Sequence, residues 1–423
     1  MPRAAAPGPG PSPAAAYSQW IDACAGAGWR AAPVAEEVPV QDGLGRITAA
    51  SVCARWPVPR SACAAMDGIA IKVGPAAAGG GGGVWQLAAA MFAWVDTGDP
   101  MPAGMDTVVE RERVRLRADG SAEITGPAPR GLNVRAVGED FPAGELLVPA
   151  GRRLRPADLA AAATAGHATL KVTRRPVAAI IPTGDEIRPV GSTLRPGDIT
   201  ESNSLMLASR ATQAGARPRV SDVQPDDTDA IAGEIRRAAL AADVVLVIAG
   251  SSAGRSDHTA AAIAGAGGLA ARGVAVRPGH PVLLGYVRAD RVRAGRSVTA
   301  IPVIGIPGYP LAAAVIFELF AVPLIAALQG RSTADRMPQR AQLACDWVSS
   351  PDVEDWVPVS LAPAAGPAAR HADCLVVATP TGRGAGSISR LLRADAWWPI
   401  PIGQGKFASG EHIDVQPIPG GPL

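Results

Sequence analysis

Apolar runs alternate with helical segments between residues 175 and 330. The runs PVAAIIP, DVVLVIAG and TAIPVIGIP contain almost no charged side chains, and segments such as ESNSLMLASRATQAG between them have the length and composition of helices. Runs of this kind are typical of strands that are buried on both faces, as in a parallel sheet covered by helices. The pattern therefore predicts a central three-layer α/β/α domain with a mostly parallel sheet.

Shorter and more mixed patterns surround this central part. Short β-like runs such as GIAIKV and TVVERERVRLR are separated by turn-forming clusters, and runs such as DWVPVSLAP follow residue 330. Turn signals at this spacing are typical of small β domains. We therefore expect a multidomain chain of the α+β and α/β classes. Its expected parts are a disordered tail (1–15), a mixed N-terminal linker domain (16–50 and 129–174), a small β domain (51–128), the α/β domain (175–330) and a C-terminal β domain (336–418).

Composition narrows the classes of function. The 423 residues are 48% hydrophobic with a formal charge of +2 and only 4% aromatic side chains, which argues against nucleic acid as a partner. No apolar segment reaches the roughly 20 residues that a membrane span requires, and the five cysteines are scattered without the spacing of a metal site. We expect a cytoplasmic protein without a membrane partner, whose cysteines are structural thiols.

The loops that follow the apolar runs carry the candidate chemistry. In an open α/β sheet, ligands bind outside the carboxyl ends of the strands, where helix N-termini attract anions. These loops combine glycines, hydroxyl side chains, carboxylates and an arginine, which together predict an anion site. They are PTGDE (182–186), PDDTD (225–229), AGSSAGRSDHT (249–259), RPGHP (277–281) and IPGYP (306–310).

Three carboxylates in these loops, Glu186, Asp226 and Asp257, accompany the cation of Arg277. Acidic side chains repel an anionic ligand unless a divalent cation stands between them, so the mixture indicates a phosphate bridged by Mg²⁺. We expect Glu186, Asp257 and Arg277 to face one shared cavity. The alternative for each loop is an ordinary turn, with Asp226 or Asp229 capping a helix.

Five motifs, taken in order, resemble the molybdopterin molybdenumtransferase family, which includes MoeA and the gephyrin E domain. The resemblance extends from about residue 17 to residue 417 and implies a central domain similar to the MogA and MoaB proteins. It also implies a Mg²⁺-dependent homodimer that inserts molybdate into adenylyl-molybdopterin and releases AMP. The motifs are AAMDGIA (64–70), VDTGDPMPAGMDTVV (95–109), VGEDFPAG (137–144), PTGDEIRPVGSTLRPGDITESN (182–203) and IPGYPLAAAV (306–315).

The resemblance assigns roles to individual residues. Glu186 and Asp257 would hold the metal or orient the attacking oxygen, and Asp226 would be a third catalytic carboxylate. Asp67 and Thr97 would act across the dimer interface, with plain turn chemistry as the alternative. The residues expected to bind the substrates are Thr183, Gly184, Asp185, Gly250, Ser251, Ser252, Gly254, Arg277, His280, Pro307, Gly308 and Pro310.

Departures from the family pattern fall at proposed ligand contacts. Where the family carries lysines around its PGKP motif, this chain has Gly273, Arg277 and His280. Arg277 keeps a charge that suits a tetrahedral oxyanion, whereas Gly273 loses one. We expect an altered affinity for molybdate or tungstate, and we expect Gly273→Lys to lower the molybdate concentration needed for half-maximal turnover.

Two further readings of the sequence stay open beside an active insertase. A divergent relative could bind the pterin or the oxyanion without turnover, as a carrier or sensor, and Gly273 favours that reading. The sister activity, adenylylation of molybdopterin, belongs to single-domain relatives of the α/β fold. The long N-terminal half and the β-rich C-terminal region argue against it.

Overall fold

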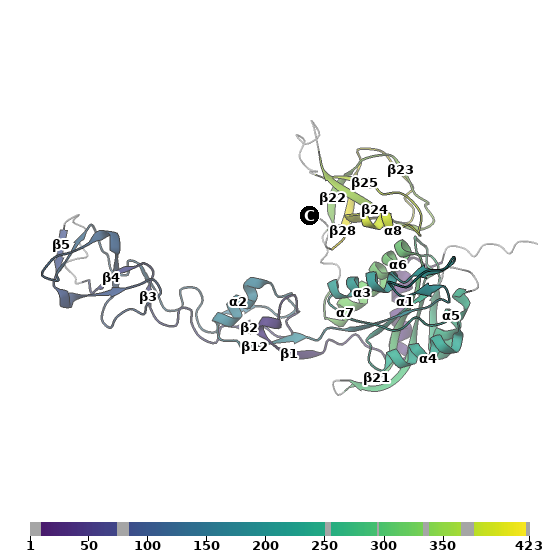
Figure 1. Cartoon of the computed structure of the whole chain (residues 1–423), viewed down its shortest axis with the longest axis horizontal. Coiled ribbons are helices and arrows are strands. Elements are labelled where there is room, and N and C mark those ends of the chain that lie inside the picture. The colour runs from purple at the N-terminus through teal and green to yellow at the C-terminus, as the bar shows by residue number, and fades with distance from the viewer. Residues whose placement is uncertain are drawn as a thin grey trace, which may run out of the picture. The chain divides into compact units, whose positions relative to one another are not determined.

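The computed structural model describes residues 10–73, 84–249, 255–293, 296–332, 338–364 and 376–419, with the side chains at 255–257 and 290–297 excepted. The chain divides into two compact units, Met1–Val34 with Arg174–Leu423, and Ala35–Thr173 (Figure 1).

The first unit contains a six-stranded sheet in the order β16-β13-β17-β21-β20-β18. The first four strands in this order pair in parallel, whereas β20 and β18 extend the sheet in antiparallel fashion. The sheet is therefore mostly parallel, as predicted, whereas its antiparallel edge was not predicted. The strands are β13 (Val177–Pro182), β16 (Arg217–Val220), β17 (Val244–Ala249), β18 (Gly267–Arg272), β20 (Leu283–Arg293) and β21 (Arg296–Pro307).

Helices cover both faces of this sheet (Figure 1). Ala178 and Ile180 of β13 contact one hydrophobic core with α1, α3, α6 and α7, and their neighbours Ala179 and Ile181 contact a second core with α4 and α5. Alternate residues of one strand thus serve opposite layers, and the three-layer prediction is confirmed. The helices are α1 (Pro13–Gly26), α3 (Asn203–Gln213), α4 (Thr228–Ala239), α5 (Arg255–Ala266), α6 (Pro310–Ile316) and α7 (Val322–Leu328).

Helix α1 packs against the central sheet. Its Trp20 is fully buried and donates a hydrogen bond from Nε1 to the carbonyl of Gly285 on β20, at 2.6 Å. Burial also raises the pKa of the Cys24 thiol to about 12, in accord with a structural role. From the sequence we expected this helix to belong to the linker domain and the ordered part of the chain to begin at residue 16. Instead, the helix begins at Pro13, where Ser12 caps the amide of Ala15.

A single long helical segment, Pro310–Leu328, crosses the interior of this unit. It joins α6 and α7 through a π-helical turn, η4 (Phe317–Ala321). Its 19 residues are long and apolar enough to cross a membrane by length and composition, yet 83% of its most apolar window is buried inside the protein, as in the core helix of a globular domain. Glu318 in the π-helical turn pairs with Arg210 of α3, and the two side chains are only 4% and 13% exposed.

A second six-stranded sheet forms the C-terminal part of the unit, in the order β19-β24-β25-β22-β28-β26. The segment VAVRP (274–278), which lies within the range expected for the α/β domain (175–330), supplies β19 and pairs in parallel with β24. Its place is therefore at the edge of the C-terminal sheet. The strands are β19 (Val276–Arg277), β22 (Gln339–Leu343), β24 (Glu354–Pro363), β25 (Val376–Pro380), β26 (Ala396–Ile400) and β28 (His412–Pro417), with the pair β23 (Trp347–Val348) and β27 (Lys406–Phe407) and the short helix α8 (Ile388–Leu392) beside them.

The second unit is built from small sheets. Two three-stranded sheets, β6-β4-β7 and β5-β9-β8, form its β-rich part, and the pair β1-β12 lies with α2 in the remainder. The elements are β1 (Ala35–Pro39), β2 (Val52–Cys53), β3 (Cys63–Ala64), β4 (Gly68–Ile71), β5 (Val84–Leu87), β6 (Phe92–Val95), β7 (Thr107–Glu110), β8 (Val114–Leu116), β9 (Ala122–Thr125), β10 (Val134–Arg135), β11 (Leu146–Val148), α2 (Pro156–Thr164) and β12 (Thr169–Thr173).

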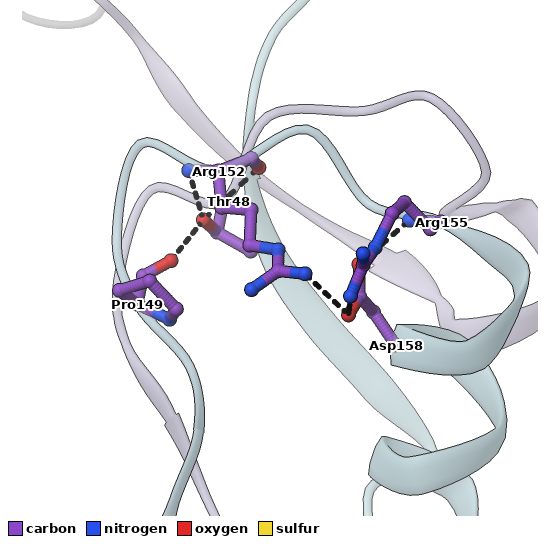
Figure 2. A network of polar contacts seen from close by, with 5 residues as sticks. All are labelled: Thr48, Pro149, Arg152, Arg155 and Asp158. Atoms are coloured by element: carbon purple, nitrogen blue, oxygen red, sulfur yellow. Dashed lines mark hydrogen bonds and ion pairs between the residues drawn. The ribbon is translucent and has the colours of Figure 1, made fainter.

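A polar network joins distant segments of the second unit (Figure 2). Asp158, near the start of α2, is almost buried and pairs with Arg152 and Arg155 at 3.4 and 3.2 Å. Thr48 donates to the carbonyl of Pro149 at 2.7 Å and accepts from the amide of Arg152 at 3.0 Å. Both arginines and Pro149 precede α2 in the chain. The network therefore holds the segment that leads into α2 against the segment around Thr48.

Candidate functional site

A cavity of about 330 Å³ opens at the carboxyl ends of β13, β17 and β21, where an open α/β sheet is expected to bind its ligand. We call it the first cavity. Loops after the strands, the start of α3 and the start of α6 form its wall. It is lined by Pro182, Thr183, Glu186, Ile187, Ile199, Thr200, Glu201, Ser202, Asn203, Ile248, Ala249, Gly308, Tyr309, Pro310 and Gly386.

The PTGDE loop brings Glu186 to this cavity. Gly184 has a φ of +138°, and a Cβ there would lie 3.1 Å from the Glu186 carboxylate and 2.7 Å from Ile187, so the loop requires glycine. The Thr183 hydroxyl donates to the carbonyl of Ile248 at 2.9 Å. That bond connects the loop to β17. It also uses the hydroxyl proton that we expected Thr183 to donate to a substrate.

The PDDTD loop lies against the first loop. The amide of Asp226 donates to Asp185 Oδ1 at 3.3 Å, and Asp227, not Asp226, caps α4 by accepting from the amide of Ala230 at 2.8 Å. The N-cap of α4 is therefore Asp227. At the same edge, Thr228 Oγ1 lies 3.0 Å from His258 Nδ1, a contact between the starts of α4 and α5 that the sequence did not suggest.

Two residues at the start of α3 line the first cavity and were not predicted as site residues. Glu201 Oε1 accepts from the amide of Ser204 at 2.8 Å, and Asn203 Nδ2 donates to the carbonyl of Gly308 at 2.7 Å. Glu is not among the residues that commonly cap a helix N-terminus. The sequence predicted the helix from the segment ESNSLMLASRATQAG, but not that the helix begins at the cavity.

A second cavity of about 280 Å³ lies where the central and C-terminal sheets meet. It contains two cations, Arg277 and Arg383, and a carboxylate, Asp355, which accepts from Ser349 Oγ at 2.8 Å. The Arg383 guanidinium stacks 4.2 Å from the centre of the Trp347 ring. Its wall consists of Arg277, Pro278, Leu311, Trp347, Asp355, Trp356, Val357, Pro358, Gly382, Arg383, Gly384 and Ala385.

Glu186 and Arg277 therefore face different cavities, and the prediction of one shared cavity is wrong for this pair. The start of α6 stands between them, with Pro310 lining the first cavity and Leu311 the second. The reason is topological, because Arg277 lies on β19, which pairs with β24 of the C-terminal sheet. His280 lines neither cavity, and it bonds from Nδ1 to the carbonyl of Val274 at 2.7 Å.

Gly273 is not part of a regular strand. It follows the end of β18 with a φ of +79°, and a Cβ at this position would lie 3.5 Å from Cε1 of His280. The departures at positions 273 and 280 are therefore in contact.

The remaining candidates divide into described and undescribed residues. Pro307 ends β21 beside Ala249, Gly308 accepts from Asn203, and Pro310 opens α6 at the first cavity. Gly250, Ser251, Ser252 and Gly254 lie outside the described residues. The backbone of Asp257 lies in the first turn of α5, but its side chain also lies outside the described part.

Asp67 and Thr97 of the second unit contact each other. Asp67 Oδ1 accepts from the Thr97 amide at 2.7 Å and from its hydroxyl at 2.8 Å. These bonds favour the ionised carboxyl group and hold the pKa of Asp67 below its ordinary value. Both residues are exposed, so the pair is an ordered, negatively charged turn on the surface of its unit.

Comparison with known proteins decides the family. The model of the MoeA N-terminal region (domain I and II) matches residues 16–166, that of the "Probable molybdopterin binding domain" matches residues 179–327, and that of the MoeA C-terminal region (domain IV) matches residues 340–418. The chain belongs to the MoeA family. The resemblance carried by the five sequence motifs is thereby confirmed.

Individual members of the MoeA family agree with this placement. Two structures of a molybdopterin biosynthesis MoeA protein from Pyrococcus horikoshii have TM-scores of 0.73 and 0.72, cover 96% of this chain and 98% and 100% of theirs, and are 28% and 22% identical. Molybdopterin molybdenumtransferase 2 of Mycobacterium tuberculosis is 30% identical over 159 residues, which are 36% of each chain. The molybdopterin molybdenumtransferase of Nostoc is 31% identical over 134 residues, 31% of this chain and 29% of the relative. The chain thus covers less than half the length of these curated relatives.

Proposed function

We propose that this MoeA family member inserts molybdate into adenylyl-molybdopterin and releases AMP. The observation that carries the proposal is a pair of cavities on the two sides of one helix start, one with carboxylates at the ends of parallel strands and one with two arginines. A reaction that joins a pterin nucleotide to an oxyanion requires neighbouring sites of different chemistry. The relatives named as molybdenumtransferases support the same reaction.

The residues divide between the two substrates. The pterin nucleotide would occupy the first cavity, with its phosphates toward Asp226 and the N-terminal turn of α5, because free N–H groups at a helix start favour phosphate. The oxyanion would occupy the second cavity, where the guanidinium of Arg277 suits the geometry of a tetrahedral anion. Attack of a water oxygen would break the phosphoanhydride, which frees AMP on the side of the carboxylates and leaves the other phosphate on the pterin substrate.

Magnesium is part of the proposal, with Glu186 and Asp257 as its ligands. No three His, Cys, Asp or Glu side chains among the described residues form a metal-binding group. Mg²⁺ commonly takes only one or two carboxylates and completes its shell with water and substrate phosphates, so two acidic residues fit it. Bound there, the ion would neutralise the pyrophosphate charge.

Homodimer formation in the cytoplasm completes the proposal. The ordered Asp67–Thr97 turn would serve the site of a second copy, since a carboxylate that remains ionised can orient a cationic or donor group. Four cysteines in the described part of the chain are free thiols, which agrees with a reducing compartment.

An AMP-release assay tests the proposal directly. The purified chain, given adenylyl-molybdopterin, Mg²⁺ and molybdate, should release AMP, and Asp257→Ala should suppress the release by roughly a hundred-fold, as expected for loss of a metal-binding carboxylate. Asp229→Ala is the matched control, because Asp229 is an exposed residue in the first turn of α4. Binding of the nucleotide without AMP release under any divalent metal would favour a non-catalytic carrier instead.

A further inference from the structure

A short buried connection leads from the central sheet to the C-terminal sheet. Gly273 follows the end of β18, and Arg277 is the last residue of β19, which pairs with β24. Between them, Val274, Ala275 and Val276 are at most 2% exposed. Arg277, at the end of the connection, lines the second cavity. The path of the connection therefore determines where the guanidinium of Arg277 can lie.

The backbone of Ala275 bonds to two different parts of the chain. Its carbonyl accepts from the amide of Glu354 on β24 at 2.9 Å. Its amide donates to the carbonyl of Pro11, also at 2.9 Å, in the segment that precedes α1. A buried amide that loses its partner is costly. The bond to Pro11 is therefore a second point, besides β24, at which the connection is held.

Gly10 packs directly on the same connection. A Cβ on Gly10 would lie 2.9 Å from the carbonyl oxygen of Gly273, 3.2 Å from the carbonyl carbon and 3.3 Å from the nitrogen of Val274. These three atoms belong to one peptide bond, so the backbone of Gly10 lies against that bond. Such a close approach of two backbones requires glycine. Any larger residue at position 10 must displace either its own segment or the connection.

Helix α1 supports the segment Gly10–Ser12. Ser12 caps the helix, and Trp20 bonds from its indole nitrogen to the backbone of β20 at 2.6 Å. Trp20 also belongs to the same hydrophobic core as Val274 and Val276. The segment is thus attached to the central sheet through α1, and from there it holds the connection in place.

We propose that the segment Gly10–Ser12 positions Arg277 for the oxyanion and thereby sets the affinity of the second cavity for molybdate. Gly10 and Pro11 line neither the first nor the second cavity, so they are positioning residues that act through Arg277. The inference rests on the proposed function in one respect, the place of the oxyanion in the second cavity. It goes further because it gives a segment that precedes the first helix a role in substrate affinity.

Two glycines provide a matched pair of alanine substitutions. Gly10→Ala places a Cβ against the peptide bond after Gly273, whereas Gly26→Ala, at the last residue of α1, places one in open space. Gly10→Ala should raise the Kd for molybdate alone, measured by titration calorimetry, roughly two- to ten-fold, as expected when one hydrogen bond is lost. Gly10→Val should raise it further, and Gly26→Ala should leave it unchanged. An unchanged Kd in both Gly10 variants would overturn the inference.

A double-mutant cycle separates positioning from a general loss of structure. If the segment acts through Arg277, Gly10→Ala should not weaken molybdate binding further in a chain that carries Arg277→Ala. The affinity for pterin, followed by the fluorescence of the ring as a probe, should stay the same in every variant. An equal loss of molybdate affinity in both backgrounds, or a parallel loss of pterin affinity, would indicate a general structural effect and would also overturn the inference.

The same measurements distinguish this inference from the proposed function. If Arg277→Ala weakens molybdate binding and the Gly10 variants do not, only the role of the segment fails. If Arg277→Ala alone leaves molybdate binding unchanged, the oxyanion is bound elsewhere and both proposals about this cavity fail. A chain that binds molybdate in the expected pattern but releases no AMP keeps the role of the segment and loses the transferase activity.

Discussion

The two cavities beside the start of α6 differ in the sign of their charge. The first contains Glu186 and Glu201 without a lining cation among the described residues, and the second contains Arg277 and Arg383 with Asp355. Both lie next to ends of parallel strands, where fold alone would predict an anion site. The difference shows that the position in the sheet locates a cavity, but the side chains at each loop decide the charge of its wall.

The cavities also share supports. Pro310 and Leu311, consecutive residues of α6, face the first and the second cavity respectively, and the loop from 382 to 386 contributes to both walls. A displacement of this helix or loop would alter both sites. Variants that affect one cavity alone therefore test whether the division of chemistry is real.

The largest expected effect follows from breaking the Arg210–Glu318 pair, which joins α3 of the first cavity to the central helix. Glu318→Ala leaves a buried guanidinium without its partner, and we expect a loss of about 3 to 5 kcal/mol in the free energy of unfolding. Urea denaturation followed by circular dichroism measures it. Glu123→Ala, which breaks an ion pair whose side chains are 44% and 21% exposed, should cost at most about 1 kcal/mol.

The same variant sharpens the comparison of the cavities. Because Glu201 and Asn203 lie at the start of α3 and line the first cavity, Glu318→Ala should weaken pterin binding more than molybdate binding in protein that remains folded. Equal weakening of both would mean that the central helix supports the two cavities alike.

Arg277→Ala should have the next largest effect. Loss of a charge-assisted contact should raise the molybdate concentration for half-maximal turnover roughly ten- to a hundred-fold and leave the affinity for pterin unchanged. Steady-state AMP release and probe fluorescence measure the two quantities. Arg272→Ala, an arginine at the end of β18 that lines neither cavity, is the matched control. A parallel loss of pterin affinity would contradict the separation of the sites.

The sequence predicted the central domain well because its elements are determined locally. Uninterrupted apolar runs gave β13, β17 and β21, and the loops that follow them lie at the first cavity as expected. It failed where a short segment could join either of two sheets. VAVRP has only two paired residues, and its pairing with β24, about 80 positions later, depends on the tertiary structure of the C-terminal sheet.

The site was predicted in part for the same reason. Glu186 belongs to a loop whose strand is unmistakable, whereas Asn203 and Glu201 look like an ordinary helix start until α3 is placed against Gly308. The family resemblance indicated Arg277 as a ligand residue but not which cavity contains it. Residue types thus predicted carboxylates and a cation near the strand ends, and contacts between distant segments decide how these groups are divided between the cavities.

Substitutions at position 273 should have the smallest effect on the protein. They also test most directly the prediction that Gly273→Lys lowers the molybdate concentration needed for half-maximal turnover. The φ of +79° at this position is unfavourable for any residue with a Cβ, so Gly273→Ala and Gly273→Lys should each lose about 1 to 2 kcal/mol of stability. The Cβ itself would be in ordinary contact with His280, so the cost is in the backbone. The difference between the two variants therefore isolates the ammonium group. If Gly273→Lys needs less molybdate for half-maximal turnover than Gly273→Ala, a cation at this turn still reaches the oxyanion. If the two variants need the same concentration, the anion is held within the Arg277 cavity, beyond the reach of position 273.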